Sequence, residues 1–339
     1  MRYALKRFTN PILFQGSLKR KRYFEGWYFK HVAADRGAVF AFIPGISLSP
    51  RGSTAFVQLI DGATGRTRWF PYPLDAFSYS RDEFVISVGE NRFSLRGIDV
   101  RLRDGEGEVE AHLAYSGITP LPFSLGSPGI MGPYAYVPFM ECYHGVGSLD
   151  HRVDGDVHIG NRRFDFAAGR GYLEKDWGRS MPLAWIWAQA NGYAGPGSCI
   201  LFSLARIPWL GRSFPGFFAL LAEGNAGRRD GTTAGGAPAI HRFASYTGAR
   251  VASAELRGRD LFVVVRDRRC VLHLHAERSH EGVLLAPVDG AMERRIAESI
   301  DARISVRLED TSGRTLFEGS GGSAGLEIVG DPSLIGVRA

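Results

Sequence analysis

The feature that most constrains this chain is an alternation of apolar and polar residues with a period of two. In residues 98–103 every second residue is apolar, and the alternation resumes after a turn at 104–107. Successive side chains of a strand point to opposite faces, so this pattern predicts a β-hairpin with one buried face. The same pattern recurs at 261–275 and 304–316. Strands spaced so evenly predict antiparallel sandwiches or barrels.

Length and composition agree with an all-β chain of two domains. At about 150 residues per domain, 339 residues make roughly two domains. The 43 glycines favour tight turns over long helices. We expect a basic N-terminal arm at 1–22, a first β-domain at 23–150 and a second at 151–339, packed together. The helix expected is at 290–300, where apolar residues lie four apart.

A weak internal repeat also suggests two domains of similar plan. Trp27 and Trp185 each lie in an aromatic strand that is followed by a glycine-containing turn and an apolar strand. Coincidence is an alternative, because aromatic strands before glycine turns are common. The glycine-rich stretch 224–239 is typical of a surface loop.

The basic charge is concentrated at the N-terminus. The net charge is +6, yet residues 1–30 alone carry +7 and the remaining residues sum to −1. Nucleic-acid binders usually spread a basic stripe over the folded face, so we expect no nucleic-acid partner. The arm has two interpretations: a solubilising segment, or a peripheral contact with an anionic membrane, worth about 1 kcal/mol per basic residue near the lipid.

Several other classes of protein are disfavoured. Three scattered cysteines are too few for a disulfide framework or a zinc site, and an odd number suits a reducing compartment. No stretch of 18 apolar residues and no signal-peptide core occurs. We therefore expect a cytoplasmic protein, either free or peripheral to the inner face of the membrane.

Common cofactor and metal motifs are missing or weak. The P-loop pattern and any Asp-Asp pair are absent from the sequence. Residues 319–324 fit GxGxxA, but no helix is expected after them. His273, His275 and His280 are near one another in sequence without a supporting carboxylate cluster, so we expect no metal site.

Two segments place carboxyl groups among large aromatic residues. They are YFEGWYFK at 23–30 and GYLEKDWG at 171–178, which continues to WIWAQAN at 185–191; residues 140–145 are a weaker third case. An aromatic pocket raises the pKa of a carboxyl group, so Glu25 or Glu174 could act as a general acid. Alternatively, the acids pair with Lys30, Lys175 or an arginine, and the aromatic residues are core.

These motifs resemble a known family. YFEGWYFK is similar to the opening motif of tocopherol cyclases, and GYLEKDWG with PLAWIWAQAN at 182–191 resembles their second motif. The resemblance covers roughly residues 10–330. Residues 172–178 are more distantly similar to a motif of carotenoid hydratases, which place an acid at the Glu174 position. Plant tocopherol cyclases carry Asn where Asp176 stands, which argues against Asp176 as the essential acid.

The resemblance implies lipocalin-like barrels and an intramolecular lyase or isomerase that needs no cofactor. Such an enzyme closes a prenylated benzoquinol to a chromanol. Glu174 would be the proton donor and Glu25 a second acid or orienting group. The substrate-binding residues implied or suggested by the three segments are Trp27, Tyr28, Glu141, Tyr143, His144, Tyr172, Trp177, Trp185, Trp187 and Gln189.

Two other functions stay open. Water could add to an isoprenoid alkene, as in carotenoid hydratases, by the same acid chemistry. The barrels could instead only carry or store a hydrophobic isoprenoid, with the acids as structural partners.

Overall fold

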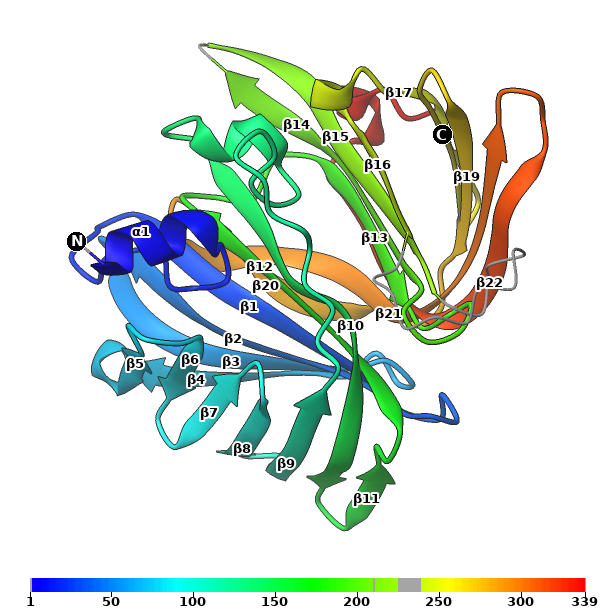
Figure 1. Ribbon diagram of the computed structural model, residues 1–339. Coiled ribbons are helices and arrows are strands. Elements are labelled where there is room, and N and C mark those ends of the chain that lie inside the picture. Colours follow the sequence, from blue (N-terminus) through cyan, green and yellow to red (C-terminus); the bar gives the residue numbers. More distant parts are fainter. Residues whose placement is uncertain (1, 210, 225–238, 339) are drawn as a thin grey trace. The chain divides into compact units, whose positions relative to one another are not determined.

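The computed structural model describes residues 2–209, 211–224 and 239–338 (Figure 1). It is nearly all β-structure and divides into two compact units. Unit 1 comprises residues 1–61, 66–181 and 284–295, and unit 2 comprises 62–65, 182–283 and 296–339. The all-β prediction is confirmed. Most of the expected loop at 224–239 lies outside the described residues.

Unit 1 is built on one large antiparallel sheet in the order β4-β3-β2-β1-β12-β10-β9-β8-β7-β6-β5, with β11 beside β10. Its elements are α1 (Arg2–Thr9), β1 (Tyr23–Val32), β2 (Val39–Ser49), β3 (Gly52–Asp61), β4 (Thr67–Pro73), η1 (Leu74–Ala76), β5 (Phe77–Tyr79), β6 (Val85–Val88), β7 (Asn91–Ser94), β8 (Gly97–Asp104), β9 (Gly107–Ser116), η2 (Gly132–Tyr136), β10 (Cys142–Ile159), β11 (Arg162–Asp165) and β12 (Gly169–Gly178).

Unit 2 has a second antiparallel sheet in the order β16-β15-β14-β13-β22-β21-β19-β18-β17. Its elements are β13 (Trp185–Asn191), β14 (Cys199–Trp209), β15 (Arg212–Glu223), β16 (Ala239–Ala244), η4 (Ser245–Thr247), β17 (Arg250–Arg257), β18 (Asp260–Arg266), β19 (Cys270–Glu277), β22 (Thr315–Val329) and η5 (Pro332–Ile335). Two strands, β20 (Gly282–Val288) and β21 (Ala291–Asp310), contribute residues to both units.

The two sheets share one topology. In each, four consecutive strands run outward, and the last strand of the sheet returns to pair with the first: β12 with β1, and β22 with β13. The two edge strands of each sheet are consecutive in the chain and are joined by a short 3-10 helix: η1 joins β4 to β5, and η4 joins β16 to β17. The repeat around Trp27 and Trp185 corresponds to the first strands of the two sheets. However, Trp27 packs in the core of unit 1, whereas Trp185 lies on the face of β13 opposite the core of unit 2.

The predicted domain boundary near 150 falls inside β10. This strand pairs with β9 on one side and β12 on the other, and β12 in turn pairs with β1. Unit 1 therefore extends through β12, and the units divide between Met181 and Pro182. The boundary is set by the pairing of β1 with β12, whose residues are about 150 positions apart in the sequence.

The predicted hairpins are confirmed as β8–β9, β18–β19 and β21–β22. The helix expected at 290–300 is wrong, because these residues form the beginning of β21. Residues four apart, such as Ile296 and Ile300, lie on one face of a helix but also on one face of a strand. The spacing of four could not distinguish the two. No helix among the described residues is long and apolar enough to cross a membrane.

The N-terminal arm is only partly a free arm. After α1, the residues Ile12, Leu13 and Phe14 are buried in the hydrophobic core of unit 1. Phe14 packs against Phe77 and Tyr79, with ring centroids 5.4 and 4.5 Å apart. The exposed basic segment is therefore limited mainly to residues 17–22.

Candidate functional site

A buried cluster of charged residues lies on two neighbouring strands of unit 1, β10 and β12. The register places Tyr28 of β1 opposite Glu174 of β12, and Asp176 of β12 opposite His144 of β10. Glu174 and Asp176 are two residues apart, so their side chains leave the same face of the strand. That face is opposite the core, because the adjacent Leu173 packs in the core. The antiparallel pairing therefore gathers these side chains from distant parts of the chain.

His144 lies between the two carboxylates. Its Nδ1 is 2.9 Å from Oδ1 of Asp176, and its Nε2 is 3.1 Å from Oε2 of Glu174. The hydroxyl of Tyr172 donates a hydrogen bond of 2.6 Å to the same Oε2 of Glu174. Glu174 and Tyr172 are buried, and the His144 side chain is largely so. We name these four residues the His144 cluster.

The electrostatics of the cluster keep His144 protonated. Burial by itself lowers the pKa of this histidine, but the charges of Glu174 and Asp176 and their hydrogen bonds outweigh burial and raise its pKa to about 10. At neutral pH the imidazole is thus an imidazolium held between two acids. The cluster stores a proton at a buried position, which is the arrangement needed for general-acid chemistry.

The ligand atoms of His144, Glu174 and Asp176 all lie within 4.8 Å of one another, close enough to consider a metal ion. One ion could coordinate only one of the two ring nitrogens. Each nitrogen faces a different carboxylate, so a metal would have to displace the imidazole from one of its acidic partners. The donor set fits an imidazolium with two carboxylates better than a metal centre.

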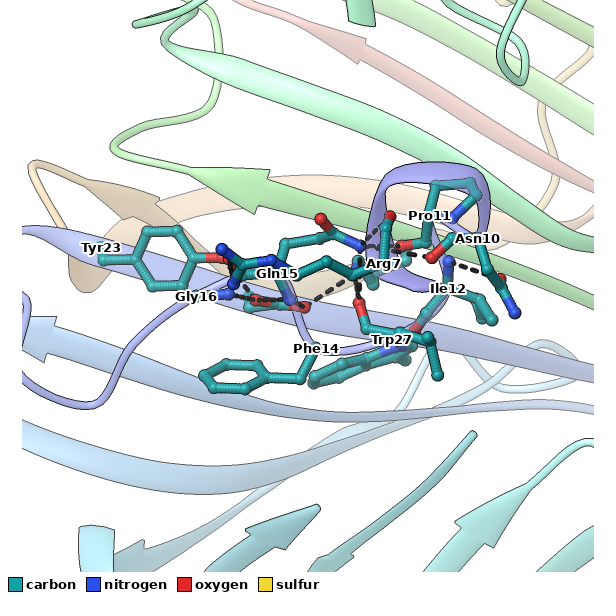
Figure 2. A network of polar contacts seen from close by, with 12 residues as sticks. Arg7, Asn10, Pro11, Ile12, Phe14, Gln15, Gly16, Tyr23 and Trp27 are labelled. Atoms are coloured by element: carbon teal, nitrogen blue, oxygen red, sulfur yellow. Dashed lines mark hydrogen bonds and ion pairs between the residues drawn. The ribbon is translucent and has the colours of Figure 1, made fainter. Parts of the chain in front are cut away.

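Glu25 lies on the other face of the same sheet. Its carboxylate is fully buried and accepts hydrogen bonds from the backbone N–H groups of Gln15 and Gly16 and from the Tyr23 hydroxyl. Its Oε1 is also 2.7 Å from Nζ of Lys175. Figure 2 shows the network of polar contacts around the N-terminal segment, in which Gln15, Gly16 and Tyr23 are labelled. The ion pair of Glu25 with Lys175 is one of the structural alternatives considered above. The role of Glu25 as a second acid stays a prediction.

The aromatic residues near Glu25 surround the Lys175 ammonium. Nζ of Lys175 lies 5.2 Å from the Trp27 ring centroid and 4.4 Å from that of Trp177, which stacks on Tyr143 at 5.4 Å. The indole N–H of Trp27 donates to the carbonyl of Ile12. Indole faces favour a nearby cation, and the cation beside Trp27 and Trp177 in this structure is a lysine of the protein itself.

The remaining predicted residues lie elsewhere. Trp185, Trp187 and Gln189 are buried on β13 of unit 2, on the face opposite its core. The Trp185 indole donates to Glu327, and Gln189 donates to Asn191 at 3.3 Å. Glu141 directly precedes β10 in unit 1, and burial raises the pKa of its carboxyl group although Arg179 opposes the shift.

Asp176 gains an importance that the motifs alone did not assign, and Lys175 is the partner among those considered that binds Glu25. Asp176 is the second acid on His144, and its place two residues after Glu174 was the available signal. Lys175, between them in sequence, points to the opposite face and binds Glu25. The three consecutive residues Glu174, Lys175 and Asp176 thus serve two separate charge clusters.

Comparison with known proteins supports the fold. No protein-family model matches the chain, and no curated protein matches it. The structure of CghA with Sch210972 is similar, with a TM-score of 0.50, 11% identity, and 91% of this chain and 89% of CghA covered. Kievitone hydratase from Nectria haematococca gives a TM-score of 0.50 at 10% identity, over 90% of this chain and 89% of the hydratase. At these identities the likeness confirms the lipocalin-like all-β fold of this chain.

Proposed function

We propose that the protein is an acid–base enzyme acting on the alkene of a prenyl or other isoprenoid chain, and that its reaction is closure of a prenylated benzoquinol to a chromanol. The observation that carries this proposal is the His144 cluster, in which a buried imidazolium is 3.1 Å from Glu174. The motif resemblance around Glu174 and the lipocalin-like fold support it.

The proton reaches the alkene through Glu174. An imidazolium–carboxylate pair and a neutral imidazole–carboxylic acid pair hold the same proton, and loss of water favours the neutral pair. A hydrophobic substrate that displaces water would therefore shift the proton from Nε2 of His144 to Glu174. The carboxylic acid then protonates the alkene, while Asp176 on Nδ1 keeps the imidazole oriented.

The reaction is balanced without an oxidant or cofactor. One alkene carbon gains the proton from Glu174, and the other becomes a tertiary carbocation. A phenol oxygen of the same substrate attacks this carbon and forms the ring C–O bond. The phenol proton leaves to the Glu174 carboxylate and passes back to Nε2 of His144, which restores the resting imidazolium–carboxylate pair. Holding the oxygen near the cation provides an effective molarity of about 10⁵ M or more for well-oriented groups.

Two other functions share part of this support. In a hydratase, water replaces the phenol oxygen as the trap; a hydratase, kievitone hydratase, is among the similar structures. In a carrier, the isoprenoid binds without reacting, and the His144 cluster is only structural. The products distinguish the three functions, because cyclisation leaves the mass unchanged, hydration adds one water, and a carrier yields no product.

The test is the variant Glu174→Gln, assayed with a prenylated benzoquinol by mass spectrometry. We expect the wild-type protein to form a product of unchanged mass. Glutamine cannot deliver a proton, so the variant should lose at least about a hundredfold in rate. Its far-ultraviolet circular dichroism should match that of the wild type.

Glu223→Gln is a matched control, because Glu223 of unit 2 also pairs with a histidine, at 2.6 Å from Nε2 of His241. We expect this variant to keep wild-type turnover. Full activity of Glu174→Gln on a substrate that the wild type converts would exclude Glu174 as the proton donor. A bound isoprenoid with no conversion by the wild type would favour the carrier.

A further inference from the structure

Unit 1 exposes a group of large apolar side chains on α1 and on the segment that leads to β10. Phe139 is 99% exposed and Leu125 is 76% exposed, far beyond the partial exposure usual for single surface residues. The group consists of Phe8, Phe123, Leu125, Tyr136 and Phe139, and we call it the apolar rim.

Contacts within the apolar rim connect its parts. The Phe8 ring stacks on the Tyr136 ring at 5.2 Å, which joins α1 to η2. The Tyr136 hydroxyl donates a hydrogen bond of 2.7 Å to the carbonyl of Leu125. Backbone hydrogen bonds between Ser124 and Ser127 form a tight turn with Leu125 near its tip. The exposed side chains are thus presented by backbone that is itself hydrogen-bonded.

Phe139 has a backbone conformation that is unusual for its type. Its φ of 63° lies in the left-handed region, which a bulky residue adopts only with strain. The side chain gains no burial within the described structure in return, since it is almost fully exposed. A strained and exposed phenylalanine suits a contact made outside the chain itself.

The exposed basic segment 17–22 lies at the same end of the sheet. Gly178 at the end of β12 pairs with Phe24 at the start of β1 and with Cys142 at the start of β10. The segment before β1 and the segment before β10 therefore emerge about two strand spacings, roughly 10 Å, apart. The first contains the basic residues 19–22, all exposed, and the second contains most of the apolar rim.

We propose that this end of unit 1 docks on an anionic lipid surface, with Phe139 and Leu125 inserted among the lipids and the basic segment bound to the headgroups. Apolar side chains beside lysines and arginines are the combination that binds such surfaces. A second copy of the chain would bring two basic segments together, and their repulsion disfavours a symmetric dimer through this surface. The proposal concerns the surface and does not depend on the proposed reaction.

The test is co-sedimentation of the full chain with vesicles of phosphatidylcholine alone or of phosphatidylcholine with phosphatidylglycerol. We expect binding to the anionic vesicles, with much weaker binding at high salt and to phosphatidylcholine alone. The double variant Phe139→Ser/Leu125→Ser should bind at least about tenfold more weakly. It should fold normally, because neither side chain is buried. Lys19→Glu/Lys21→Glu should reduce binding by a similar factor or more.

Matched controls come from unit 2. Trp209→Ser removes an exposed aromatic residue, and Arg268→Glu/Arg269→Glu makes the same change of charge at exposed positions. Both should bind like the wild type. Equal binding to both kinds of vesicle, equal losses in the controls, or no binding to either vesicle would overturn the proposal. So would a dimer in sedimentation velocity that Phe139→Ser dissociates, because the apolar rim would then bind a second copy.

Discussion

At the scale of single residues, the face of the sheet to which an acidic side chain points determines its interaction partners. Glu174 and Glu25 lie on neighbouring strands in similar aromatic sequence, yet they point to opposite faces of the sheet. Glu174 meets His144 and Tyr172, whereas Glu25 meets Lys175 and the backbone of the N-terminal segment. Two motifs that look alike in sequence thus contribute to different clusters.

A pair of buried histidines outside the His144 cluster, His31 and His151, makes the protein sensitive to acid. Burial, and to a lesser extent the charge of His151, lowers the pKa of His31 to about 3, and burial lowers that of His151 to about 3. Both histidines stay neutral in the folded protein but bind protons below their usual pKa of 6.5 in the unfolded chain. The contribution of the two neutral histidines to the unfolding free energy is therefore complete above pH 6.5. It falls as the pH decreases toward 3, by about 1.4 kcal/mol per pH unit for each histidine.

Urea unfolding at a series of pH values would measure this loss. His31→Gln removes one of the two titrating groups, so we expect the decline of the unfolding free energy between pH 6 and about 4 to become less steep. His280→Gln is the control, because it makes the same substitution at an exposed position. An equally steep decline in His31→Gln would show that other groups cause the acid sensitivity.

At the scale of elements, the buried pair of Glu25 and Lys175 attaches the N-terminal segment to the sheet. Nζ of Lys175 also donates a hydrogen bond of 2.6 Å to the carbonyl oxygen of Leu13. The Glu25 carboxylate accepts a hydrogen bond from the backbone N–H of Gln15. Glu25 is thus hydrogen-bonded to a segment that contributes Phe14 to the core. Without this segment, a fully buried ion pair would lose several of its hydrogen bonds.

Removing one partner of this pair should be far more damaging than removing both. Glu25→Gln leaves a buried ammonium without its counter-charge, and we expect it to lower the unfolding free energy by about 3–5 kcal/mol. Glu25→Gln/Lys175→Met removes both charges and should be more stable than Glu25→Gln alone. Chemical denaturation of the two variants and the wild type would measure the difference.

An exposed ion pair provides the control for that experiment. Arg101 and Glu110 pair across β8 and β9 at the surface, where such pairs contribute at most about 1 kcal/mol. Glu110→Gln should therefore change stability little. If Glu25→Gln were equally mild, the buried pair would not hold the N-terminal segment.

At the scale of the whole molecule, the chain does not divide into units at a single point. Residues 284–295 follow most of unit 2 in sequence but belong to unit 1. Within unit 1, the Gln58 side chain exchanges two hydrogen bonds with the backbone of Leu285, and the Ser47 hydroxyl donates to the carbonyl of Gly290. A fragment that ends at Met181 lacks these partners.

We therefore expect the fragment 1–181 to unfold at a lower temperature than unit 1 within the whole chain. Adding a synthetic peptide of residues 282–295 should raise the melting temperature of the fragment, because the peptide restores bonds to buried Gln58 and Ser47. The same peptide should raise it less in a Gln58→Ala fragment. Circular dichroism recorded during heating would measure the melting temperature of each fragment with and without the peptide. A peptide without effect on either fragment would contradict the expectation.

The sequence alone determined the local features of this protein: the strands and three hairpins, the basic N-terminus, and the two segments that combine acids with aromatic residues. These follow from alternation and turn residues, which act over a few neighbours. Only the tertiary structure decided the extent of unit 1, the strand at 291–310 and the different partners of Glu25 and Glu174. Those depend on register between strands far apart in the chain, and a shift of one residue would exchange the two faces.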